Sequence, residues 1–187
     1  MTKSTSLALL ITALLPLSLD AKGTITGEVQ SGELREASGI AASRVNPEVV
    51  WLHNDGQTNQ LFGVRTTGET VAVLEWPNAV VDLEDVATGP GANEGETYLY
   101  IGDIGDNDAR RPQVRVYRTV EPQLAPPGTG PQYLSAVMED FRFTFPDGPV
   151  DAEALLVDPL TRDIYIVSKE KKQARVFRAS ADKLKPR

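Results

Sequence analysis

Acidic, amide and other polar residues recur at corresponding positions along this chain, and they are the residues that could carry chemistry. One set begins short apolar segments: Glu36 and Ser38; Asp82, Glu84 and Asp85; Asp151 and Glu153. The other set ends the segments that follow: His53, Asn54 and Asp55; Asp103, Asp106, Asn107 and Asp108; Lys169 and Glu170. Carboxylates held close together repel one another unless a cation or a proton neutralises them.

Clustered oxygen ligands of this kind favour Ca²⁺ over softer metals, so the sequence predicts a calcium site. The predicted ligands are Glu84, Asp103, Glu153 and, more weakly, Asn54. The residues predicted to face a bound ligand from the same side are Asp55, Asp85, Asn107 and Lys169. An alternative of equal weight is that acids beside strand starts only cap turns or line a solvated rim.

Catalytic groups are harder to identify. His53 is the only histidine and could act as a general base, although a single histidine at a strand end is more often hydrogen-bonded for structure. Asp106 is a second weak candidate. It lies in the run from Gly102 to Asp108, whose glycines permit tight turns and whose acids could surround a cation. The run is not an EF-hand loop, because the twelfth residue from Asp103 is Val114. The chain has no cysteine and no nucleophile-elbow motif.

A repeat along the chain indicates how these polar residues are positioned. The predicted units lie near 34–76, 80–145 and 149–187. Each unit begins with a polar position and an apolar segment, passes a turn, and continues with a strongly apolar segment that ends in polar residues. In an antiparallel pair, the start of the first strand and the end of the second lie at the same end of the sheet. We therefore expect both polar sets to meet at one face.

The predicted fold is all-β, and specifically a β-propeller of which this chain holds about three four-stranded blades. Ser38 and Glu84 are 46 residues apart, and repeats of about this length with several short strands are typical of propeller blades. Fourth strands are expected over 70–75 and 138–144. A β-sandwich is the competing architecture, but it would not require the same plan three times. Because propellers usually close with four to eight blades, we expect a fragment whose missing blades lie beyond residue 187.

The N-terminus is predicted to be an export signal spanning residues 1–23, followed by the partial propeller over 24–187. Lys3 precedes an apolar stretch from Leu7 to Leu19, and Ala21-Lys22-Gly23 offers small residues for cleavage. The stretch is too short for a spanning helix, so we expect a periplasmic or secreted protein without membrane contact after cleavage. An uncleaved anchor or a buried hairpin is the alternative.

The overall charge restricts the partners. The formal net charge is −7, and no cluster of lysine and arginine reverses it locally. Such a surface repels phosphates, which excludes DNA and RNA as partners. It suits a cation, or a small molecule or protein ligand on the acidic face. With no cysteine, packing or a bound ion must stabilise the fold outside the cytoplasm.

On these residues the chain resembles exported bacterial six-bladed β-propeller proteins: the gluconolactonase and regucalcin-like superfamily, the SdiA-regulated proteins and the esterase-like group associated with phytases. The segments that carry the resemblance are 38–41, 53–55, 82–87, 102–107 and 151–158. The resemblance implies a calcium or other divalent ion near the central channel, ringed by acids and asparagine. It also implies that this chain corresponds to the N-terminal portion of such a protein.

Two functions remain open from the sequence. One is a non-catalytic propeller that binds a ligand or partner on the acidic face, and this interpretation is slightly favoured because no acid/base pair can be defended from the residues alone. The other is a metal-assisted hydrolase of an ester, lactone or phosphoester, in which a rim carboxylate or His53 would activate water. Fold alone does not choose between them.

Overall fold

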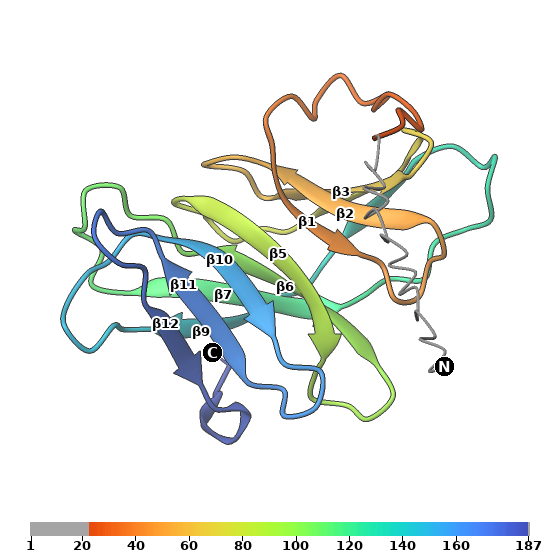
Figure 1. The fold of residues 1–187 in the computed structure, drawn as a ribbon. Helices are drawn as coiled ribbons and strands as arrows, with labels where there is room; N and C mark the ends of the chain where they lie inside the picture. Colours follow the sequence, from red (N-terminus) through yellow and green to blue (C-terminus); the bar gives the residue numbers. More distant parts are fainter. Residues whose placement is uncertain (1–22, 187) are drawn as a thin grey trace, which may run out of the picture.

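The computed structural model describes residues 23–186 and is all-β, with one short 3₁₀ helix, η1 (Ala181–Lys183). Residues 1–22 of the predicted export signal lie outside the described residues. The strands form three open sheets (Figure 1). Within residues 23–186, no helix is long and apolar enough to cross a membrane.

The first sheet is a four-stranded antiparallel meander to which a fifth strand is added. Its strands, in spatial order, are β1 (Ala37–Ala42), β2 (Val49–Asn54), β3 (Gln60–Arg65), β4 (Thr70–Glu75) and β8 (Gln132–Ser135). The pairing of β8 with β4 is parallel, whereas the other pairs are antiparallel. The fourth strand that the sequence predicts over 70–75 is therefore present as β4.

The second and third sheets are entirely antiparallel. The second contains, in order, β5 (Leu83–Pro90), β6 (Thr97–Asp103), β7 (Val114–Val120) and β9 (Glu139–Phe143). The third contains β10 (Ala152–Val157), β11 (Ile164–Ser168) and β12 (Val176–Ala179). Apart from β8, each sheet takes its strands from one repeat unit. Since the described residues form open sheets, the number of blades and their closure remain predictions.

The Pro-rich connection after β7 crosses back to the first sheet. The Glu121 carboxylate accepts hydrogen bonds from Trp51 Nε1, at 2.8 Å, and from the Ser43 hydroxyl. Asn46 Nδ2 donates to the Pro122 carbonyl at 2.9 Å. These contacts fix the chain against the β1–β2 turn, from which it continues to β8. The prolines between residues 121 and 131 predict an extended excursion here, but the sequence does not predict the added strand.

The second sheet is buried on both faces and holds the other two together. Leu99 and Ile101 of β6 belong to the core shared with the first sheet, whereas Tyr98 and Tyr100 belong to the core shared with the third. This division follows from the two-residue period of a strand. The first strand of each sheet lies on the inside of the molecule, and we call β1, β5 and β10 the inner strands. The strand β5 lies between β1 and β10, and all three run in the same direction (Figure 1). Their starting residues therefore lie at one end of the molecule.

Candidate metal centre

The three inner strands, β1, β5 and β10, each have a shift in pairing register near their N-terminal end. Each pairs with its neighbour, shifts register within two or three residues and then pairs again: between Ala37 and Ile40 in β1, between Leu83 and Asp85 in β5, and between Ala152 and Ala154 in β10. The residues inside the shifts include Ser38, Glu84 and Glu153, which the sequence repeat aligns. β-Bulges of this kind re-aim side chains at the rims of sheets.

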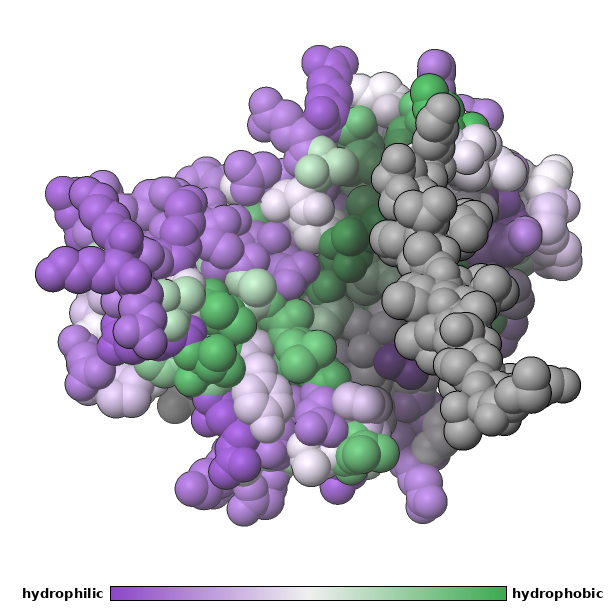
Figure 2. All heavy atoms as spheres, viewed as in Figure 1, coloured by the Kyte–Doolittle hydropathy of each residue, from purple (hydrophilic) through white to green (hydrophobic). Residues whose placement is uncertain are grey.

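These residues line an open depression of about 570 Å³ at the starts of β1, β5 and β10. Its walls are formed by Glu36, Ala37, Ser38, Asp55, Asp82, Glu84, Asn107, Glu153 and Lys169. Figure 2 shows that the side of the molecule where β5 and β10 begin is predominantly hydrophilic. The structure thus brings together five of the residues that the sequence assigns to the site: Asp55, Glu84, Asn107, Glu153 and Lys169.

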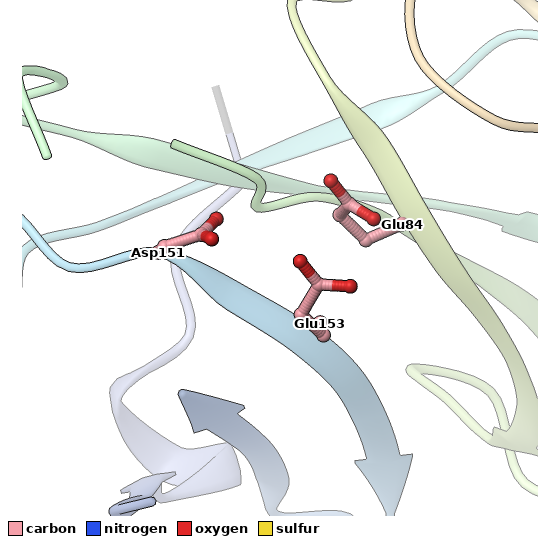
Figure 3. A group of neighbouring side chains, drawn as sticks. All are labelled: Glu84, Asp151 and Glu153. Atoms are coloured by element: carbon pink, nitrogen blue, oxygen red, sulfur yellow. The ribbon is translucent and has the colours of Figure 1, made fainter. Parts of the chain in front are cut away.

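Three carboxylates lie close together at this depression: Glu84 of β5, Glu153 of β10, and Asp151, the residue before β10. One oxygen each of Glu84, Asp151 and Glu153 lies within 4.8 Å of the others, and the side chains point toward one another (Figure 3). Two oxygens that each lie about 2.4 Å from a common ion can be at most about 4.8 Å apart. The spacing of these three groups is therefore compatible with one shared cation.

Glu84 is the most unusual member of this triad. It is only 8% exposed, yet no described residue donates a hydrogen bond to its carboxylate. Burial, followed by the neighbouring charges of Glu153 and Asp82, raises its pKa from the ordinary 4.5 to about 8. A buried carboxylate without donors is costly unless it is protonated or bound to a cation.

Gly105 allows the backbone to pass beside this carboxylate. A Cβ at position 105 would overlap Glu84 Oε1 and would lie 2.5 Å from Asp82 Oδ2. The pKa of Asp82 is also raised, first by burial and then by Asp55. Gly105, the second glycine of the run 102–108, therefore lets the two carboxylates approach the backbone, and a side chain at this position would displace them.

Asp151 and Glu153 are partly neutralised by neighbours. Asp151 Oδ1 accepts the Asp106 backbone N–H at 2.8 Å. Lys169 Nζ lies 2.7 Å from Glu153 Oε1 and 3.8 Å from Asp151 Oδ2. The pairing with Glu153 raises the pKa of Lys169. Of the three carboxylates, Glu84 alone accepts no hydrogen bond and pairs with no cation among residues 23–186.

Two of the predicted metal ligands, Asp103 and Asn54, do not line the depression and instead hold its surrounding segments. Asp103 is fully buried; its Oδ1 accepts the Asp82 backbone N–H at 2.9 Å and pairs with Arg111 at 2.8 Å. Asn54 Oδ1 accepts the backbone N–H groups of Arg35 and Glu36 at 2.8 and 3.0 Å. Asp103 thus positions the segment that carries Asp82, and Asn54 positions the segment that carries Glu36.

The two catalytic candidates are also engaged in structural contacts. His53 is fully buried; Nε2 accepts the Gly39 N–H at 3.1 Å and Nδ1 donates to the Asn54 carbonyl at 2.8 Å. Burial lowers the pKa of His53, which favours this neutral form. Asp106 accepts the backbone N–H groups of Arg110 and Arg111 at 2.9 and 2.7 Å. Both side chains therefore hold the backbone in place, and neither has a free atom aimed at the depression.

Asp85, predicted to face a ligand, instead joins two sheets. Its Oδ2 accepts the Leu155 backbone N–H of β10 at 2.7 Å, next to the triad. Burial raises its pKa in spite of this hydrogen bond. Asp85 thus fixes β5, which carries Glu84, relative to β10, which carries Glu153.

Sequence reasoning placed Asp151 on the polar face but did not select it as a ligand. The available signal was the pair of acids two residues apart, Asp82 with Glu84 and Asp151 with Glu153, which occurs in two of the three units. The contributions of Gly105 and Arg111 depend on approaches across loops that no residue pattern encodes.

The fold and the site define an all-β protein with an acidic depression at one end. No family model, curated protein or solved structure matches the chain.

Proposed function

We propose that this chain forms blades of an exported β-propeller that binds a divalent cation, Ca²⁺, at Glu84, Asp151 and Glu153, and that holds a ligand or partner on the surrounding acidic face. The repeat of inner strands, each with a register shift at the same end, supports the propeller architecture. The observation that carries the cation site is Glu84: a carboxylate that is 8% exposed, without a hydrogen-bond donor among the described residues, beside two further carboxylates.

The donor set supports calcium in particular. All three groups are carboxylates, which hard cations prefer, and the depression lies open to water that can complete a shell of six to eight oxygens. The softer ligands that zinc and copper favour do not contribute, since the only histidine is fully buried and hydrogen-bonded at both nitrogens. Three ligands in an open site are typical of weak binding, with a dissociation constant of about 10⁻⁴ to 10⁻³ M, which suits an exported protein.

Calcium titration of chelator-treated protein tests this proposal. We expect saturable heat in isothermal titration calorimetry and a higher unfolding temperature; at one hundred times the dissociation constant the stabilisation is about 2.7 kcal/mol. Glu84→Gln should remove both effects. Glu94→Gln makes the same chemical change on an exposed residue of the β5–β6 turn and should leave both intact. A folded wild-type protein that shows neither heat nor stabilisation would refute the cation site.

A hydrolase of an ester, lactone or phosphoester is the second candidate, and one observation favours it. The pKa of Glu84, near 8, is suited to proton transfer at neutral pH, and Glu153 lies beside it, paired with Lys169. His53 and Asp106 do not add to this chemistry, because their polar atoms are already hydrogen-bonded. Calcium-dependent turnover of such substrates that disappears in Glu84→Gln would select the hydrolase; calcium binding without turnover would select the binding protein.

A further inference from the structure

Lys169 occupies the position of a counter-ion at the triad. It directly follows β11, and its backbone N–H donates to the Asp151 carbonyl at 2.9 Å, which anchors the residue beside β10. Its ammonium lies 2.7 Å from Glu153 Oε1 and 3.8 Å from Asp151 Oδ2. A positive charge of the protein itself therefore rests on two of the three carboxylates proposed to bind the ion.

We infer that Lys169 is a tethered competitor of the metal ion: it neutralises Asp151 and Glu153 when the ion is absent, and the ion must displace it in order to bind. This inference rests on the proposed cation site and concerns how its affinity is set. A cation coordinated by Glu153 would share that carboxylate group with the ammonium, and two positive charges so close together repel. Double occupancy is therefore disfavoured.

The side chain of Lys169 is suited to this exchange. It is 59% exposed, so the ammonium can move into water while the backbone hydrogen bond to Asp151 keeps the residue in place. Glu84 accepts no hydrogen bond from Lys169, so this carboxylate remains available to an incoming ion. A divalent ion that satisfies all three carboxylates can displace a single charge that contacts two.

Calcium titration of matched variants measures the competition. Lys169→Met removes the ammonium and keeps an unbranched side chain, and we expect the affinity for Ca²⁺ to rise about tenfold. Lys171→Met is the control, because it removes the same charge from the exposed β11–β12 turn and leaves the triad's contacts unchanged; its affinity should change less than threefold. Circular dichroism verifies that each variant is folded.

Amine labelling of the wild-type protein provides a second measurement. Acetylation followed by mass spectrometry should modify Lys169 several times faster with Ca²⁺ than with chelator, while Lys171 and Lys172 label equally in both. Equal affinity in wild type and Lys169→Met, or weaker binding in Lys169→Met, would overturn the inference and leave the cation site standing. If calcium binds to Lys169→Met alone, Lys169 blocks the site completely, and the proposed function of the wild-type protein fails although the competition itself is supported. If no folded variant binds calcium, the proposed function itself fails, and this inference with it.

Discussion

Removing the charge of Glu84 should stabilise the metal-free protein at alkaline pH. In the folded state the pKa of Glu84 is about 8, compared with the ordinary 4.5. A carboxyl group whose pKa is raised by folding stabilises the folded state fully below pH 4.5, and that stability is lost as the pH rises from 4.5 to about 8. Each pH unit in this interval is worth about 1.4 kcal/mol, so ionisation of Glu84 costs at most about 5 kcal/mol, because water in the open depression screens part of the charge.

Urea denaturation of wild type and Glu84→Gln in the presence of a chelator measures this cost. The amide keeps the shape of the carboxyl group and cannot ionise, so the variant should be more stable by about 3–5 kcal/mol at pH 8.5 and about equal at pH 4. Calcium at one hundred times its dissociation constant should narrow the difference by about 2.7 kcal/mol, because only the wild type binds the ion. The control Glu94→Gln should follow the wild type throughout. Equal stability of wild type and Glu84→Gln in chelator at pH 8.5 would refute the argument that Glu84 is held without compensation.

Two glycine substitutions should separate the site from the architecture. In Gly105→Ala the new Cβ meets the carboxylate ends of Glu84 and Asp82, which can move, so we expect calcium affinity to fall about tenfold with little loss of stability; unchanged affinity would contradict the close approach. In Gly39→Ala the Cβ would lie 2.7 Å from the Asp85 Cα, a backbone atom that cannot move aside, so we expect a loss of about 1–3 kcal/mol in urea denaturation. Wild-type stability in Gly39→Ala would show that β1 does not pack closely on β5.

The strands were predictable from local patterns. In the segment 49–54, apolar residues lie between turn residues and end in His53 and Asn54, and β2 has these bounds. The fourth strands predicted at 70–75 and 138–144 are present as β4 and β9. The strand β8 was not predicted, because its place beside β4 depends on the contacts of Glu121 and Asn46 with distant segments. Long-range hydrogen bonds of this kind leave no periodic trace in the sequence.

The candidate site was predictable in position and only partly in membership. The repeat aligns Glu84 with Glu153, and the structure places them together because β5 and β10 begin with the same register shift. The sequence repeat could not distinguish carboxylates that face the depression from carboxylates that hold its walls. Asp103, the last residue of β6, and Asp106, in the loop that follows, use their carboxylates to hold the backbone of neighbouring loops. Asp151 also accepts one backbone N–H, but it still has an oxygen within 4.8 Å of Glu84 and Glu153. That distinction depends on loop conformation rather than on residue type.

The position of the triad between two sheets gives the proposed ion a mechanical consequence. Glu84 belongs to β5, Glu153 lies at the start of β10, and Asp151 is the residue before β10. An ion bound to all three would therefore cross-link the second and third sheets. Asp85, the residue after Glu84, already joins the same strands by accepting the N–H of Leu155, two residues beyond Glu153. Repulsion among the unoccupied carboxylates acts against that hydrogen bond, whereas a bound cation would act with it. Calcium should therefore slow amide exchange at Leu155 more than at Leu52, which lies in the first sheet; equal protection at both positions would mean that the ion stabilises the chain without clamping this junction.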